Sequence, residues 1–162
     1  MSIANSSPLE RLRDCDWSEI ADVALIPSIA GEIDRLMMDE LTKDESAPVA
    51  ERLFDILMTR FDVMAPYKKG LTSMAQNARH NKDTALALWP ALRPSMSLCL
   101  REAGLIPSLI TEHALLAGYV YIFSIWEKDI TPDSAPTMAA LNRIIQTGVK
   151  AGFLGAPPQD NP

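Results

Sequence analysis

The sequence predicts an all-α fold, and three observations support this class. Apolar residues recur at three- and four-residue intervals in most segments, capping residues precede those segments, and no segment has the alternating β-branched pattern of a strand. With 162 residues, of which 48% are hydrophobic and 22% charged, the chain can form one domain with a substantial core rather than a disordered adaptor. We expect a bundle of about seven to eight helices.

The first helices are short and are marked by their caps. Residues 7–10, Ser-Pro-Leu-Glu, have the pattern of a capping box with proline at the first helical position. Asp16 is the expected cap of a second helix, which we expect to continue until Pro27 stops it. A third helix is predicted over 28–41, and the polar residues 42–46 form a loop.

The helix predicted over 47–64 has a long amphipathic pattern. Its apolar positions keep helical spacing, and Pro66 ends it and opens the next helix. The segment 84–103 is also helical in composition. Because Pro90 and Pro94 each remove a backbone donor and crowd the preceding turn, we expect a kinked or broken helix there.

Two helices are predicted near the C-terminus, over 108–128 and 134–150. The first contains the apolar run 114–126, which is shorter than the roughly 20 residues of a membrane span, so we expect no transmembrane segment. A helix that is apolar all round has to be covered on every side. We expect one face to cover the core and the opposite face to meet a partner subunit. The tail 153–162 is predicted to be disordered.

Two late helices with spare apolar surface most simply make a four-helix contact across a two-fold axis, which predicts a homodimer. The predicted interface residues are Tyr121, Ile125, Trp126, Met138, Leu141 and Ile145.

The polar residues give little support for catalysis. His80 and His113 are isolated, and we interpret each as a structural histidine rather than a catalytic base. No paired Cys, His or carboxylate groups occur at metal-ligand spacing, and no glycine-rich loop precedes a helix with a lysine in reach. We therefore predict a protein without catalytic residues, metal or cofactor. The distant Cys15 and Cys99 are expected to be free thiols of a cytoplasmic protein.

Two stretches resemble a known family. ERLFDILMTRFDVMAPYKKGL at 51–71 and WEKDITPDSAPTMAALNRII at 126–145 are similar to the C-terminal domain of TetR-type regulators, in the branch that includes the lipid-binding accessory protein of coenzyme Q biosynthesis. The resemblance spans about residues 47–150. Most of it is carried by Phe54, Arg60, Phe61, Asp62, Pro66, Trp126, Asp129, Asp133, Thr137, Met138 and Leu141.

The resemblance implies an all-helical domain that dimerises through its last two helices and encloses an apolar pocket. In TetR-type members a ligand in that pocket moves an N-terminal helix-turn-helix, and in the coenzyme Q branch the pocket holds lipid. We therefore expect a mostly apolar cavity in which Tyr67 and Tyr119 supply hydroxyl groups. The expected lining is Phe54, Met58, Phe61, Tyr67, Met74, Trp89, Met96, Tyr119 and Phe123.

The N-terminal segment departs from the family pattern. Residues 17–24 are compatible with the first part of a helix-turn-helix, but the recognition helix and the basic segment after it are missing. Residues 1–47 carry four basic and eleven acidic side chains, a net charge of −7, whereas the remainder is close to neutral. Because phosphate contacts dominate DNA affinity, this segment should repel a duplex. A basic patch remains possible from Arg11, Arg13, Lys68, Lys69, Arg79 and Lys82.

The sequence thus leaves three functional hypotheses. The first is a dimeric protein that binds an apolar small molecule or lipid and has lost DNA reading. The second is a TetR-type transcriptional regulator with a short reader, and the third is a partner that forms heterodimers with a TetR-type paralogue. All three divide the chain into an acidic segment 1–46, a ligand-binding and dimerisation domain 47–152, and the tail.

Overall fold

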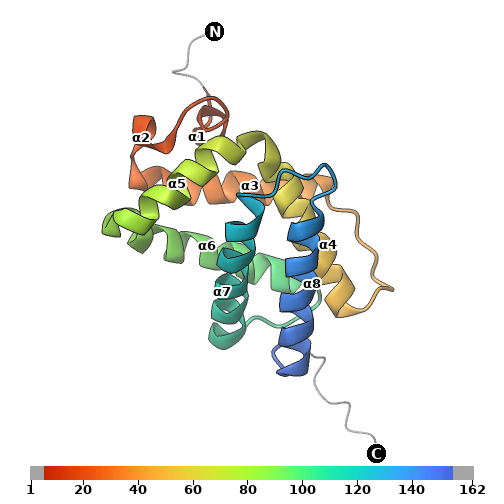
Figure 1. Cartoon of the computed structure of the whole chain (residues 1–162). Helices are drawn as coiled ribbons and strands as arrows, with labels where there is room; N and C mark the ends of the chain where they lie inside the picture. The colour runs from red at the N-terminus through yellow and green to blue at the C-terminus, as the bar shows by residue number, and fades with distance from the viewer. Residues whose placement is uncertain (1–5, 155–162) are drawn as a thin grey trace, which may run out of the picture. The chain divides into compact units, whose positions relative to one another are not determined.

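The computed structural model describes residues 6–154, and these residues are helical without any strand, which confirms the predicted fold class (Figure 1). The elements are α1 (Pro8–Arg11), α2 (Trp17–Ile20), the 3₁₀ turn η2 (Val23–Leu25), α3 (Ile26–Glu40), α4 (Val49–Met64), the 3₁₀ turn η3 (Ala65–Tyr67), α5 (Lys68–His80), α6 (Lys82–Glu102), α7 (Leu109–Trp126) and α8 (Ala135–Lys150).

The chain forms two compact units that divide it differently from the predicted domains. The first unit combines residues up to Glu40 with Arg60–Ser95, and the second combines Leu41–Thr59 with the residues from Met96 onward. Helices α4 and α6 each contribute residues to both units. The acidic segment therefore shares one unit with the end of α4, with α5 and with most of α6.

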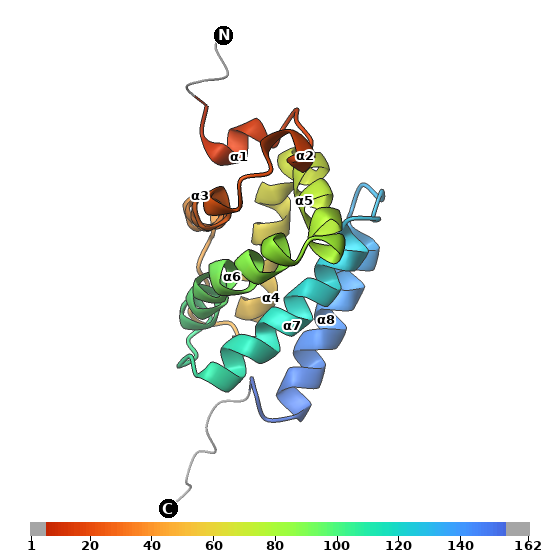
Figure 2. The ribbon, with the colours of Figure 1, turned by 90° about the vertical axis from the view of Figure 1, so that its left-hand side faces the viewer.

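The first unit holds the acidic N-terminal segment through buried apolar side chains. Leu9, Leu12 and Trp17 are almost completely buried, and α2 lies beside α5 (Figures 1 and 2). The approach is close at Gly70, where an added Cβ would lie 2.5 Å from the carbonyl oxygen of Leu12. The backbone N–H of Trp17 donates to Ser73 Oγ at 3.1 Å.

Caps position the short helices, although one prediction about them was wrong. Ser7 caps α1 as expected, and Asp16 and Glu19 form a reciprocal capping box on α2. Helix α2 does not continue to Pro27, because it ends at Ile20 and the next residue, Ala21, takes a left-handed conformation with φ of 40°. Pro27 lies instead in the first turn of α3, where a proline costs no helical hydrogen bond.

Helix α6 is continuous from Lys82 to Glu102, so the expectation of a broken helix was wrong. Pro90 and Pro94 both lie inside it. In a regular helix their missing N–H groups would have paired with the carbonyl groups of Leu86 and Pro90. Both of these residues are exposed, and water can therefore satisfy the carbonyl groups that the prolines leave without a donor.

In the second unit, α7 packs along α8 (Figure 2). They approach closely at Gly118, where an added Cβ would lie 2.7 Å from Ile144 Cγ2. The loop before α8 supplies its cap, since Asp129 Oδ2 accepts hydrogen bonds from the backbone N–H of Thr137 at 3.1 Å and from its hydroxyl at 2.6 Å.

The C-terminal end of α8 is ordered further than predicted. Gly152, with φ of 77°, donates from its N–H to the Val149 carbonyl, and Phe153 donates to the Gly148 carbonyl at 2.9 Å. These two bonds form a Schellman motif, and Leu154 is buried behind it. Residues 153 and 154 of the predicted tail belong to this motif, and residues 155–162 lie outside the described part of the chain.

Candidate ligand groove and helix surfaces

The nine residues predicted to line one cavity are divided between the two units. Most of them are buried: among these, Phe61, Tyr67 and Met74 belong to the first unit, and Met96 and Tyr119 to the second. Trp89, in the first unit, is 42% exposed. The remaining residues of the set, which are partly exposed, lie in the second unit and are Phe54, Met58 and Phe123.

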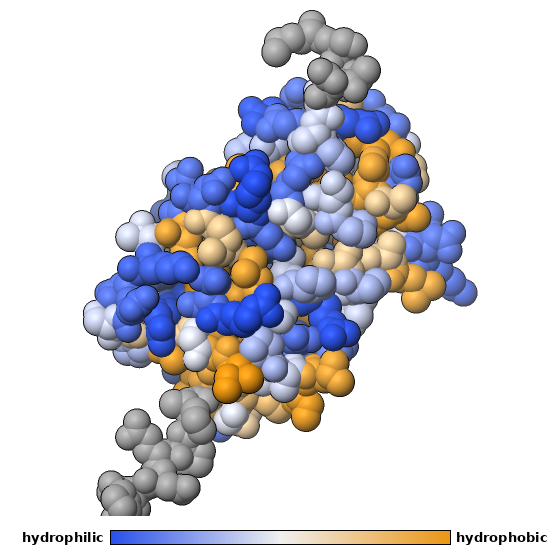
Figure 3. Space-filling model, turned by 180° about the vertical axis from the view of Figure 1, so that it is seen from behind, coloured by the Kyte–Doolittle hydropathy of each residue, from blue (hydrophilic) through white to orange (hydrophobic). Residues whose placement is uncertain are grey.

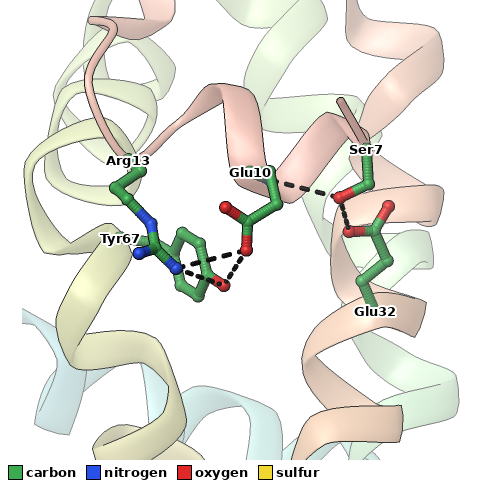
Figure 4. A network of polar contacts seen from close by, with 5 residues as sticks. All are labelled: Ser7, Glu10, Arg13, Glu32 and Tyr67. Atoms are coloured by element: carbon green, nitrogen blue, oxygen red, sulfur yellow. Dashed lines mark hydrogen bonds and ion pairs between the residues drawn. The ribbon is translucent and has the colours of Figure 1, made fainter. Parts of the chain in front are cut away.

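Tyr67 does not offer its hydroxyl to a ligand, because charged groups of α1 and its C-terminal flank already use it (Figure 4). The Tyr67 hydroxyl donates to Glu10 Oε1 at 2.6 Å and accepts from Arg13 Nη2 at 3.3 Å. The Arg13 guanidinium also lies over the Tyr67 ring, 5.2 Å from its centroid. Burial and the Glu10 contact raise the pKa of the Tyr67 hydroxyl, while the Arg13 contact opposes them.

This contact also corrects the predicted capping box of α1. The Ser7 hydroxyl accepts from the Glu10 N–H at 3.3 Å, but the Glu10 carboxylate turns to Tyr67 and Arg13 rather than to the backbone of Ser7. Ser7 Oγ in turn donates to Glu32 of α3 at 2.5 Å (Figure 4). Ser7, Glu10 and Arg13 are therefore engaged within the first unit.

A groove of about 480 Å³ lies in the second unit, between the first two turns of α4 and one side of α8. Its apolar surface comes from alanines and from three larger side chains, of which Phe54 was predicted to bind ligand and Met138 and Ile145 to form the dimer interface. Polar groups stand around this surface. The lining is Ala50, Glu51, Phe54, Asp55, Met138, Ala139, Asn142, Ile145 and Gln146.

The six predicted interface residues differ in exposure. Trp126, Leu141 and Ile145 are buried within the single chain. Tyr121 and Met138 are 45% and 40% exposed, and Ile125 is intermediate. A buried side chain has little surface left for a partner, and the dimer itself stays a prediction.

Helix α7 is not covered on every side by its own chain. Its buried residues include Leu115, Leu116, Tyr119 and Ile122, while a row on the other side is exposed. The exposed row consists of Ile110, Ala114, Ala117 and Tyr121, whose spacing of four, three and four places them on one helix face, with Val120 beside them.

Apolar residues are found both along helix α7 and in small patches on the surface. Among the described residues, α7 is the one helix with the length and apolarity of a membrane-crossing helix. Apolar surface also reaches solvent elsewhere: the face shown in Figure 3 has several small hydrophobic patches separated by hydrophilic side chains.

The first unit also contains a buried ion pair that the sequence did not predict. Arg60 of α4 is fully buried and pairs with Asp34 of α3, and Asp34 Oδ2 accepts from the Ser95 hydroxyl of α6 at 2.7 Å. The only sequence signal was an arginine inside the apolar pattern of 47–64, since the spacing of Asp34 and Arg60 gave no reason to pair them. This contact fixes three helices against one another.

One of the isolated histidines and two members of the candidate basic patch make contacts with nearby residues. His113 Nδ1 lies 2.6 Å from the Leu109 carbonyl oxygen, within its own helix. In the patch, Arg13 contacts Glu10 and Tyr67, and Lys69 pairs with Asp16 at 3.7 Å. Within residues 6–154, no group of three or more His, Cys, Asp or Glu side chains is placed to hold a metal ion.

Comparisons with protein-family models, with curated proteins and with solved structures find no significant match to this chain. The resemblance to TetR-type regulators therefore stays a prediction from the sequence.

Proposed function

We propose that this chain is a homodimeric helical protein that binds an apolar small molecule or lipid, without enzymatic activity and without DNA reading. The groove between α4 and α8 is the observation that carries the proposal. Its volume of about 480 Å³ lies in the range of small-molecule sites, which is about 300–1,000 Å³. Its residues combine an apolar surface with a few polar side chains, as ligand sites usually do.

The polar residues of the groove favour an amphiphile over a pure hydrocarbon. Glu51 and Asp55 stand on the α4 side, while Asn142 and Gln146 supply amide groups on the α8 side. An apolar chain would cover Phe54 and Met138, and a hydroxyl or other donor group on the ligand would pair with the carboxylates. Such a ligand buries apolar surface that the isolated chain leaves exposed.

Native mass spectrometry of the full-length protein, purified from its own type of host, tests the ligand hypothesis. We expect a protein mass with an added hydrophobe that is released under denaturing conditions. The variant Ala139→Trp should lose this adduct because the indole fills the groove. Ala135→Trp is the matched control, since Ala135 is an exposed alanine of α8 that does not line the groove.

Two results would contradict ligand binding in this groove. One is a wild-type protein that carries no adduct. The other is an adduct that survives in Ala139→Trp as fully as in Ala135→Trp, because the ligand would then lie elsewhere.

The dimer proposal now rests on the exposed face of α7 rather than on the whole predicted interface. Ile110, Ala114, Ala117 and Tyr121 form a row in which two small side chains lie between two larger ones. This arrangement would let the α7 helices of two subunits approach closely. The buried residues Trp126, Leu141 and Ile145 would support the interface from within each chain.

A charged side chain introduced in the middle of this row tests whether the row forms the dimer interface. Ala117→Arg should shift the molar mass measured by size-exclusion chromatography with light scattering from two chains to one. Gln76→Arg, at an exposed position of α5, is the control and should remain dimeric. A wild-type monomer, or a dimeric Ala117→Arg protein, would count against this interface.

The lack of DNA reading is supported by the short helices of the N-terminal segment. Helices α1 and α2 have four residues each, and α3 exposes Arg35 beside Asp39 and Glu40. A recognition helix places several side chains in the major groove and relies on cationic phosphate contacts, so this segment is poorly suited to the task. Specific retardation of flanking DNA at low salt, weakening steeply as salt rises, would instead support a transcriptional regulator.

A further inference from the structure

A second groove in the second unit contains an arginine, Arg52, that interacts with the Asp44 carboxylate through its charge but makes no hydrogen bond with a described residue. The groove has a volume of about 400 Å³ and lies between the loop 41–45, helix α4 and the end of α6. Arg52 reaches it from the second turn of α4. Among residues 6–154 the Arg52 guanidinium makes no hydrogen bond or ion pair, and its Nε atom is shielded from solvent.

This arrangement is unusual because an arginine has five N–H donors, and a buried donor without an acceptor costs free energy. Arg52 could avoid the cost by extending into water, since its residue is only partly buried. Instead, the Nε–H donor of Arg52 is shielded from water and has no acceptor. A ligand that supplies acceptor atoms in the groove would remove this cost.

Gly104 holds the guanidinium in place. An added Cβ at Gly104 would lie 2.9 Å from Arg52 Nη2 and 3.1 Å from Nη1, so the planar group lies directly over the glycine. Gly104 has a φ of 88° and ends α6 in a Schellman motif with Leu105, which fixes the backbone beneath the arginine. The guanidinium of Arg52 therefore lies against a regular helix end, the C-terminus of α6.

Four other charged side chains of the groove make hydrogen bonds or an ion pair. Lys43 Nζ pairs with Glu102 at 2.6 Å, and Arg101 Nη1 donates to Ser97 Oγ at 2.8 Å. Asp44 accepts from the backbone N–H and the hydroxyl of Ser46. No carboxylate among them forms an ion pair with Arg52.

The balance of charges indicates what class of anion fits. The lining has three cationic side chains, Lys43, Arg52 and Arg101, and four acidic ones, Asp44, Glu45, Asp55 and Glu102. A phosphate or polyphosphate, with two or more negative charges, would be repelled by the four carboxylates. A single carboxylate matches the fork of one guanidinium and adds only one charge.

The groove also has an apolar part. Leu41 and Ile56 line it together with the charged residues. The volume of about 400 Å³ leaves space for a short apolar body behind a carboxylate.

We propose that this groove binds a small organic monocarboxylate, whose two oxygens accept hydrogen bonds from the guanidinium of Arg52 while its apolar body lies against Leu41 and Ile56. This site goes beyond the proposed function, because its groove shares only Asp55 with the groove at Phe54 and Ala139. Ala139→Trp should leave it intact, so either proposal can fail without the other.

The test is a titration of the full-length protein with hexanoate, followed by ¹H–¹⁵N NMR of the arginine Nε–H signals. The Arg52 signal is identified by its loss in Arg52→Lys. We expect it to shift saturably with hexanoate, whereas the uncharged 1-hexanol should leave it unmoved. Inorganic phosphate should bind at least about tenfold more weakly than hexanoate, given the cost of a second charge near the carboxylates.

Two variants test whether Arg52 binds the carboxylate of hexanoate. Arg52→Lys keeps the charge but loses the fork, and Arg52→Gln loses both, so each should weaken hexanoate binding by about tenfold or more in calorimetry. Arg143→Gln removes an exposed arginine of α8 outside the groove and should bind as the wild type does. The wild-type NMR titration decides the matter even where a variant folds poorly.

The proposal is overturned if hexanoate leaves the Arg52 Nε–H signal unshifted, or if hexanol shifts it equally. Binding that is as tight in Arg52→Gln as in Arg143→Gln would also overturn it. Tighter binding of phosphate would refute the monocarboxylate class and indicate a site for a more highly charged anion.

Discussion

The two compact units are held together in different ways. In the first unit, named polar contacts join segments far apart in sequence: Glu10 and Arg13 meet Tyr67, and Asp34 meets Arg60 and Ser95. In the second unit, apolar packing of α7 on α8 dominates, and the polar and charged side chains gather around open grooves. Polar contacts fix one arrangement, whereas the second unit keeps surface for partners.

This difference agrees with the proposed roles. In the first unit, Glu10, Arg13 and Asp34 contact other residues of the same unit, which agrees with the proposal that the acidic segment does not read DNA. The second unit has an apolar groove, an exposed helix face and an arginine that makes no hydrogen bond, and each is a feature that a ligand or subunit would complete.

The largest expected effect is on the buried ion pair of the first unit. Asp34→Ala leaves the fully buried Arg60 without its carboxylate, and removal of one partner of a buried pair costs about 3–5 kcal/mol. Urea unfolding should therefore show a large loss in the free energy of unfolding. The control is Asp39→Ala, which breaks the exposed pair with Arg35 and should cost less than about 1 kcal/mol. Equal losses in the two variants would mean that the polar contacts do not hold the first unit.

A smaller effect is expected at the polar cap of the second unit. Burial acts to raise the pKa of the Asp129 carboxyl, but hydrogen bonds from Thr131 and Thr137 outweigh it and hold that pKa well below its usual range. A lowered pKa means that the charged carboxylate stabilises the folded state above the ordinary Asp pKa of about 3.9, and that this stability is lost as pH falls toward the folded-state pKa. Both carboxylate oxygens accept hydrogen bonds, Oδ1 from Thr131 and Oδ2 from Thr137, whereas an asparagine has one accepting oxygen. Asp129→Asn should therefore lower the free energy of unfolding by about 0.5–2 kcal/mol at neutral pH.

The pH dependence of stability distinguishes loss of the Asp129 charge from a loss of stability that has another cause. The difference between Asp129→Asn and the wild type should shrink as the pH is lowered below about 4, because the wild-type carboxylate is then losing its advantage. Thermal unfolding at a series of pH values measures it. A difference that stays constant with pH would show that the charge of Asp129 is not what stabilises the cap.

The sequence predicted the fold class and most helix ends because these depend on local rules. The caps at Ser7 and Asp16 were both recognisable from residue type and position. Pro27 was misread because a proline is compatible with both the end of one helix and the first turn of the next. The continuity of α6 depends on solvent exposure of its prolines, which local sequence does not reveal.

The candidate sites were harder to predict because they depend on which helix faces meet. Apolar residues such as Phe61 and Met96 have the same pattern whether they line a cavity or pack in a core. The sequence indicated that α7 had spare apolar surface, but only packing against α8 separates the exposed row at Ala117 from the buried residues. Arg52 gave no signal at all, because its importance comes from Gly104, about fifty residues away.

The smallest expected effect tests how the acidic segment is attached. Tyr67→Phe keeps the buried ring but removes the hydroxyl that contacts Glu10 and Arg13, and a hydrogen bond of this kind contributes about 0.5–1.5 kcal/mol. Hydrogen exchange should therefore become faster in α1 and its flanking residues, while α7 and α8 stay unchanged. Tyr121→Phe, which removes a hydroxyl from the exposed face of α7, is the matched control. If α1 exchanges no faster in Tyr67→Phe than in Tyr121→Phe, apolar burial of Leu9 and Leu12 alone holds the segment, and the first unit resembles the second more closely than its polar contacts indicate.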